Sequence, residues 1–300
     1  MKVRVGYGLG VRTPTVDGPR LGALVDALEG LGFDSLWLSE RLGGECPDPV
    51  LGLTFAAART TKLKLGTSVQ VLPGRNPADV AKQWATLDRL SGGRALPAFG
   101  LGVADPREQQ LFGVERSERA AWFDEALPLV RRFWSGEPVD HDGPRFHYEG
   151  AVVAPKPVQS PPDVWLGGIA KSELRRVGRL GDGWLPSFCT PDDVAAGRPA
   201  IRAEAAEHGR EIDEEHWGAL VPYLPATGAL PDLLVAAVTA RRPDVDPSHI
   251  VPAGLDATRA LLERFIQAGA SKFVLVPVIE PEGWDEHLAA VRDAVGDLEN

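Results

Sequence analysis

Short apolar runs alternate along the chain with longer segments in which apolar residues recur at helical spacing. In the segment 21–31, Leu21, Leu24, Val25 and Leu28 fall on one helical face, and Gly32 follows as a candidate C-cap. The alternation predicts strands over residues 3–8, 35–38, 63–71, 95–100, 164–167, 183–185, 217–223 and 273–276. It predicts helices over residues 21–31, 51–59, 78–90, 118–134, 172–180, 194–208, 256–268 and 284–295. Each predicted strand is therefore followed by a helix.

Repeated strand–helix units indicate a parallel sheet, and eight of them favour a closed (β/α)8 TIM barrel over an open doubly wound sheet. No long linker or change of composition divides the chain, so residues 1–300 are expected to form a single barrel domain. Three segments depart from the pattern and are expected as insertions at the C-terminal face: 136–162, 190–198 and 227–247. The first is expected to hold a hairpin near residues 146–148, and the third a helix over 230–242.

Composition and charge limit the classes of molecule that this protein is expected to bind. Lys and Arg number 32 against 42 Asp and Glu, a net charge of −10, and no basic cluster stands out. Nucleic acid and anionic membranes are therefore poor partners, and a small-molecule substrate is expected. The two cysteines, Cys46 and Cys189, form no disulfide framework and have no zinc-binding spacing. With no signal peptide and no apolar run of about 20 residues, these features favour a cytoplasmic protein.

In a (β/α)8 barrel the chemistry lies at the carboxyl ends of the strands. Glu40 and Arg41 both end the second strand. They could pair with each other as an inert salt bridge, or serve as a proton-transfer acid and an anion anchor. Asp105 follows the fourth strand, so a paired-carboxylate glycosidase using Glu40 and Asp105 is a minor alternative.

Three further segments could shape a binding site. Thr67, Ser68 and Gln70 put polar groups into an otherwise apolar third strand, where they could equally be satisfied inside the core. Gly100 and Gly102 end the fourth strand, where they could leave room for a flat ring or form a simple turn. They do not belong to a G-x-G-x-x-G dinucleotide fingerprint, because Asp105 stands at the position of its third glycine.

The segment 167–172 follows an apolar strand and opens a helix. Its two glycines, Gly167 and Gly168, could expose backbone N–H groups to phosphate, or make a tight turn only. The chain shows no Walker loop, no G-x-S-x-G nucleophile motif and no His pair with metal-binding spacing, so no metal site is expected.

Several longer runs resemble the bacterial luciferase-like family. They occur in order as GFDSLWLSE at 32–40, AAARTT at 56–61, LGTSV at 65–69, RNP at 75–77, ATLDRLSGGR at 85–94, PKPVQ at 155–159, and GDGW at 181–184. The resemblance covers nearly the whole chain, and ATLDRLSGGR is its most specific part. It implies a (β/α)8 barrel that binds FMN or the deazaflavin coenzyme F420, and this chain looks closer to the deazaflavin branch of actinobacterial oxidoreductases.

The resemblance also implies site residues. A non-proline cis peptide behind the deazaflavin ring maps to Ser68–Val69, and the phosphate site maps to the backbone of Gly167, Gly168 and Ile169. The complete set of implied cofactor-binding residues is Ser39, Thr67, Ser68, Val69, Gly100, Gly102, Gly167, Gly168 and Ile169. The implied catalytic residues are Glu40, Arg41 and Asp105.

One residue departs from the family pattern. Arg41 stands where the family usually has a His, which takes part in proton transfer in the sugar-phosphate dehydrogenases of the branch, so oxidation of a sugar phosphate is not expected. The predicted function is hydride transfer between C5 of coenzyme F420 and a small organic substrate. The alternatives are an FMNH2-dependent monooxygenase using O2 and a non-catalytic flavin- or deazaflavin-binding protein. Family members are often dimeric, so a homodimer is a possible assembly.

Overall fold

The computed structural model describes residues 2–11 and 17–300. Within these residues, eight strand positions run parallel around a ring, and two of them are interrupted. Their bounds are β1 (Arg4–Leu9), β2 (Ser35–Leu38), β3 (Lys64–Thr67) with β4 (Gln70–Val71), β5 (Ala95–Leu96) with β6 (Ala98–Gly100), β9 (Trp165–Leu166), β10 (Gly183–Trp184), β11 (Gly218–Tyr223) and β12 (Lys272–Pro277).

The hydrogen-bonded pairs close the ring. One sheet has the order β11-β12-β1-β2-β3-β5 and the other β10-β9-β6-β4. The interrupted strands belong to both sheets, because β3 pairs with β5 while its continuation β4 pairs with β6. Parallel bridges from Trp184 to Trp217 and from Ser187 to Leu220 join β10 to β11 and complete the circle. The predicted (β/α)8 barrel is thereby confirmed.

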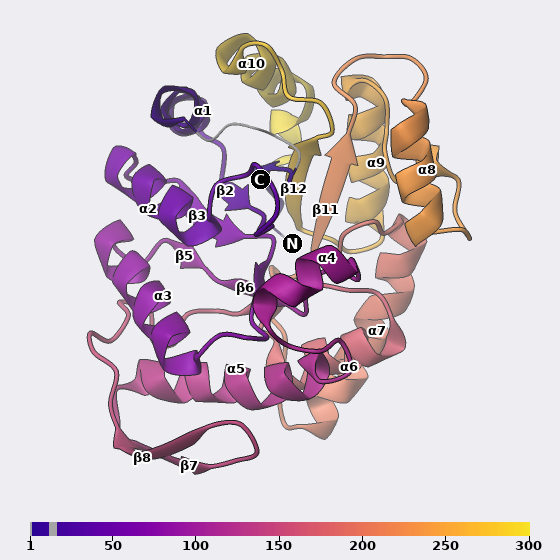
Figure 1. Ribbon diagram of the computed structural model, residues 1–300. Coiled ribbons are helices and arrows are strands. Elements are labelled where there is room, and N and C mark those ends of the chain that lie inside the picture. Colours follow the sequence, from indigo (N-terminus) through magenta and orange to yellow (C-terminus); the bar gives the residue numbers. More distant parts are fainter. Residues whose placement is uncertain (1, 12–16) are drawn as a thin grey trace.

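Helices surround the strands, as Figure 1 shows. Their bounds are α1 (Gly18–Gly30), α2 (Pro49–Arg59), α3 (Pro77–Ser91), α5 (Arg119–Ser135), α6 (Lys171–Leu180), α7 (Pro191–Glu207), α9 (Leu255–Gln267) and α10 (Trp284–Val295). Local sequence fixes where several begin. Asp48 and Asn76 each accept a hydrogen bond from the first turn of α2 and α3, and a proline follows each of them.

Shorter elements complete the chain. They are α4 (Pro106–Gln109), η1 (Gln110–Phe112), the hairpin β7 (Val139–Asp142) and β8 (His147–Ala151), α8 (Asp232–Arg241), η2 (Pro247–His249) and η3 (Gly296–Leu298). The sequence pattern did not predict α4, although Asp105 followed by Pro106 is a helix-start signal.

Of the three segments expected at the C-terminal face, only 227–247 contributes to it, through α8. The hairpin in 136–162 follows the C-terminal end of α5, away from the barrel mouth, and lies along the outer side of that helix (Figure 1). Phe133 of α5 and Tyr148 of the hairpin meet there at 5.1 Å between ring centres. The segment 190–198 is no insertion, because the Thr190 side chain caps α7, which begins at Pro191.

Large aromatic side chains fill the barrel below its C-terminal end. Trp37 on β2 and Trp165 on β9 are buried and meet edge to face at 6.2 Å between ring centres. Gly66 on β3 makes room for this packing, since a Cβ there would lie 2.4 Å from the Trp37 ring. These side chains close the barrel interior beneath its mouth.

Candidate functional site

A cavity of about 500 Å³ opens at the carboxyl ends of the strands. That volume falls within the range of small-molecule and cofactor sites. All but three of the site residues predicted from the sequence line it, and the three that do not are Thr67, Asp105 and Ile169. Apolar side chains from β6, β9, β11 and β12 make much of its wall: Phe99, Leu166, Leu220 and Val276.

The third strand breaks at the cavity. The peptide bond between Ser68 and Val69 is cis, as the family resemblance implies. The Ser39 hydroxyl donates a hydrogen bond of 3.0 Å to the Ser68 carbonyl and lies 3.1 Å from the Ser68 hydroxyl. Both serines and Val69 face the cavity, so β2 and the strand break together form one wall.

Thr67 has a structural place just below this wall. Its hydroxyl is fully buried, donates to the Ala98 carbonyl at 2.6 Å and accepts from the Ala98 N–H at 3.0 Å. These two bonds replace ladder contacts where β3 ends and β6 begins. Thr67 therefore supports the strand break, and its predicted cofactor contact would be indirect.

Glu40 is buried in the wall, with 2% of its side chain exposed. One carboxylate oxygen accepts a hydrogen bond of 2.7 Å from the Val71 N–H, and the other pairs with the Arg75 guanidinium. Burial raises the pKa of Glu40 above its ordinary value, and the Arg75 charge and the Val71 bond offset only part of that effect. Glu40 is therefore a buried carboxyl with a raised pKa in the cavity wall.

Arg41 does not pair with Glu40. Its side chain lines the cavity and makes no ion pair or hydrogen bond with any residue in the described ranges. Of the two possibilities open for these neighbours, the inert salt bridge is absent among the described residues, because Glu40 takes Arg75 from the loop after β4 instead.

Asp105 stands outside the cavity wall, where its carboxylate caps α4 by accepting a 2.9 Å hydrogen bond from the Arg107 N–H. The acid that α4 does bring to the wall is Glu108. Its carboxylate accepts bonds from the Leu42 and Gly43 N–H groups at 2.7 and 3.2 Å. Sequence reasoning missed Glu108, although an acid in the first turn after the Asp105–Pro106 cap was the available signal.

Gly100 and Gly102 line the cavity floor, but neighbouring side chains use part of the space they leave. A Cβ on Gly100 would lie 2.5 Å from a Val69 methyl, so Gly100 lets the strand break pack onto β6. A Cβ on Gly102 would lie 2.7 Å from the Arg119 guanidinium.

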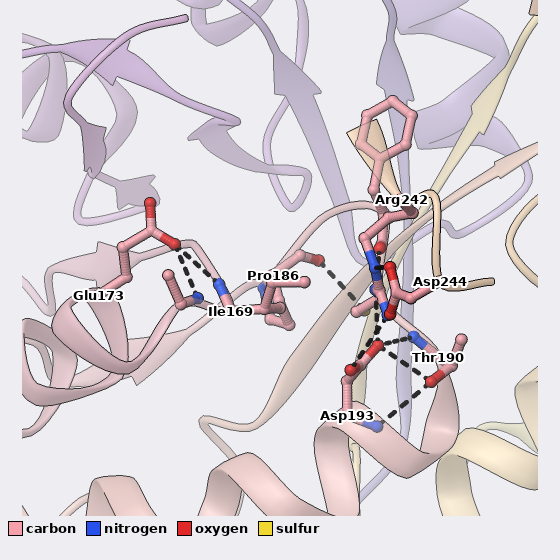
Figure 2. Close-up of polar contacts among 10 residues, drawn as sticks. Ile169, Glu173, Pro186, Thr190, Asp193, Arg242 and Asp244 are labelled. Carbon is pink, nitrogen blue, oxygen red and sulfur yellow. Dashed lines mark hydrogen bonds and ion pairs between the residues drawn. The ribbon is translucent and has the colours of Figure 1, made fainter. Parts of the chain in front are cut away.

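The turn before α6 does hold an anion, and that anion belongs to the protein. One oxygen of the Glu173 carboxylate accepts hydrogen bonds from the Ile169 and Ala170 N–H groups, each at 3.0 Å. Figure 2 shows Glu173 folded back toward Ile169. Gly168 has a φ of +93°, and a Cβ there would lie 2.4 Å from the same carboxylate. Gly167, Gly168 and Glu173 line the cavity. A phosphate bound at this turn would have to displace Glu173.

The model of the luciferase-like monooxygenase family matches residues 5–227. The chain belongs to that family. Two curated relatives are similar to it. The first is a phthiodiolone/phenolphthiodiolone dimycocerosates ketoreductase of Mycobacterium sp. (strain JLS), which is 33% identical over 55% of this chain and 44% of the relative. The second is an F420-dependent glucose-6-phosphate dehydrogenase of Kineococcus radiotolerans, which is 33% identical over 60% of this chain and 56% of the relative. The alignments thus span about half the length of these luciferase-like relatives.

A solved structure shares the barrel fold over the full length of this chain. The coenzyme F420-dependent tetrahydromethanopterin reductase of Methanopyrus kandleri superposes with a TM-score of 0.80, covers 100% of both chains and is 21% identical in sequence. At that identity the similarity shows the fold. Among residues 2–11 and 17–300, no helix is long and apolar enough to cross a bilayer.

Proposed function

We propose that this luciferase-like protein is a coenzyme F420-dependent oxidoreductase acting on a small organic substrate. The observation that carries the proposal is the cavity at the barrel mouth, whose apolar walls and volume of about 500 Å³ suit a tricyclic ring with a substrate beside it. The choice of F420 is supported by the dehydrogenase of Kineococcus, which carries that cofactor in its name.

The residues present fit such a cofactor at three places. Ser39, Ser68 and Val69 would back the ring, and Gly100 and Gly102 would lie beneath it, because all of them line the cavity. The backbone of Gly167, Gly168 and Ile169 would hold the phosphate once Glu173 has left the Ile169 and Ala170 N–H groups. Bound F420 would supply or accept a hydride at C5, and the chain would bind, orient and shield the reactants.

The proton that accompanies the hydride is assigned to Glu40. Its carboxyl lines the cavity and has a raised pKa, whereas Asp105 caps α4 outside the wall. In the reduction of a carbonyl, Glu40 would give its proton to the carbonyl oxygen as the carbon is reduced. In the oxidation of an alcohol, Glu40 would take the proton from the hydroxyl. Glu40 must loosen its contact with Arg75 to do this, and Arg41 is free to steady negative charge on the substrate.

The test is a side-by-side titration of the purified protein with oxidised F420 and with FMN, followed by ligand fluorescence. Selective micromolar binding of F420 is the expected result, and it would direct the next assay to enones, imines and ketones with reduced F420. Selective FMN binding would replace the proposal with an FMNH2-dependent monooxygenase, which the family description favours, and oxygen uptake would then be measured. Binding of neither contradicts both, and tight binding without turnover on any substrate indicates a binding protein.

A further inference from the structure

The charged side chains of the cavity wall differ in whether they already have hydrogen-bond or ion-pair partners. Three carboxylates and three guanidiniums line it: Glu40, Glu108, Glu173, Arg41, Arg176 and Arg241. Every carboxylate is already engaged, Glu40 by Val71 and Arg75 and the other two by pairs of backbone N–H groups. Arg176 is engaged as well, because its guanidinium donates to Asp124 at 2.7 Å.

Arg41 and Arg241 are the exceptions. Within residues 2–11 and 17–300, neither guanidinium has an ion pair or a side-chain hydrogen bond. The two come from opposite parts of the chain, Arg41 following β2 and Arg241 ending α8, yet both face one cavity. Desolvation lowers the pKa of Arg241, Glu173 partly offsets this, and the positive charge of Arg41 lowers it further. Arg41 and Arg241 therefore present the same charge to one cavity.

Arg241 is held in place by its neighbour. The Arg242 side chain is 8% exposed and donates to the Phe188 carbonyl at 2.7 Å, and it pairs with Asp193 and Asp244 at 2.8 and 2.9 Å (Figure 2). This network ties the end of α8 to the loop after β10. Phe188 has a φ of +53°, and the Arg241 guanidinium carbon lies 4.5 Å from the centre of its ring. Stacking on an aromatic face orients a guanidinium while leaving its N–H edge free to bind.

We propose that Arg41 and Arg241 form an anion-binding pair at the cavity mouth, taking a carboxylate or phosphate of the molecule bound there. Two guanidiniums that line one cavity, neither with an ion-pair partner among the described residues, suit an oxyanion, because a guanidinium donates to one in a bidentate manner. The inference rests on the proposed function in placing the reaction in this cavity. The oxyanion can come from the phosphate and glutamate tail of F420 or from an anionic substrate, and both share this chemistry.

The test compares wild type with Arg41→Gln, Arg241→Gln and the double variant. Arg175→Gln is the matched control, because Arg175 is an exposed arginine of α6 that does not line the cavity. Thermal unfolding without ligand establishes that each variant is folded. Fluorescence titrations use oxidised F420 and the corresponding deazaflavin riboside, which has the same ring and lacks the phosphate and glutamates.

If the pair binds the cofactor tail, the double variant loses at least about tenfold in F420 affinity and keeps its affinity for the riboside. If it binds an anionic substrate, F420 affinity is unchanged, but succinate and inorganic phosphate perturb the fluorescence of the wild-type complex and lose that effect in the double variant. The proposal is overturned if F420 affinity is unchanged and the two anions act alike on the double variant and the control, or not at all.

These outcomes are separable from failure of the proposed function. If wild type binds neither F420 nor FMN, inorganic phosphate is titrated into the cofactor-free protein and followed by phosphorus NMR. Saturable phosphate binding that the double variant loses and Arg175→Gln keeps would support the arginine pair by itself. Equal behaviour of the three proteins would overturn it.

Discussion

The carboxylate of Glu40, just after β2, accepts a hydrogen bond of 2.7 Å from the Val71 N–H, which belongs to the strand segment beyond the cis Ser68–Val69 bond. The strand break therefore both shapes the ring wall and supplies a donor to the buried acid. A carboxylate held in this way can keep its Val71 bond through a change of protonation state, while its contact with Arg75 loosens.

Replacing Glu40 by Gln is expected to slow hydride transfer by about 100-fold, because the amide still accepts from Val71 but exchanges no proton. The F420 dissociation constant should change little. Stopped-flow absorbance of F420 measures the rate, and the fluorescence titration measures binding. A variant that keeps the wild-type rate would remove Glu40 from the proton transfer.

The raised pKa of Glu40 sets the pH dependence of that step. In the reducing direction the protonated acid is needed, so the rate should fall as the pH rises through a pKa above the ordinary value for Glu. In the oxidising direction the carboxylate is needed, and the rate should rise over the same range. Both inflections should vanish in Glu40→Gln, and a profile that Glu40→Gln leaves unaltered would contradict the assignment.

Glu173→Gln is expected to tighten the binding of FMN or F420 about threefold to tenfold. The wild-type carboxylate occupies the Ile169 and Ala170 N–H groups that a phosphate would use, and a neutral amide competes less well for them. Riboflavin, which has no phosphate, serves as the control ligand and should show no gain. Weaker FMN binding in the variant would mean that Glu173 supports the turn more than it blocks it.

Gly168→Leu is expected to abolish cofactor binding while the barrel stays folded. A side chain at this φ of +93° is strained, and its Cβ would meet the Glu173 carboxylate. Fluorescence titration and circular dichroism test the two parts separately. Unchanged binding in a folded Gly168→Leu protein would show that the phosphate lies elsewhere.

At the opposite end of the barrel, Lys272 on β12 and Asp34 before β2 form an ion pair, with 6% and 7% of their side chains exposed. Lys272→Met should lower the free energy of unfolding by about 3 kcal/mol, because it leaves a largely buried carboxylate with weaker contacts to Lys64 and Arg4. Lys64→Met, at a site 46% exposed, should cost less than about 1 kcal/mol. Urea unfolding measures the free energy of unfolding of both variants, and cofactor binding should not change in either. Equal effects of the two substitutions would contradict the prediction.

The sequence by itself determined the order of the strands and helices, because hydrophobic periodicity, glycine C-caps and Asp-Pro or Asn-Pro starts act within a few residues of one another. It also placed most of the cavity wall, since the carboxyl ends of parallel strands meet at one rim. The position of the cis bond followed from the family resemblance of the run LGTSV, because no residue propensity or spacing marks a non-proline cis bond.

Tertiary structure alone decided which charges meet. Glu40 takes Arg75 in place of its neighbour Arg41, Glu108 enters the wall while Asp105 caps α4, and Glu173 folds back onto the turn at Ile169. Arg241 reaches the cavity because Arg242 ties α8 to the loop that carries Phe188. Except for Glu173 and Asp105, these partners lie tens of residues apart or more, and a side chain's partner depends on where the backbone brings the competing donors. The number of residues between two side chains does not say how close the fold brings them.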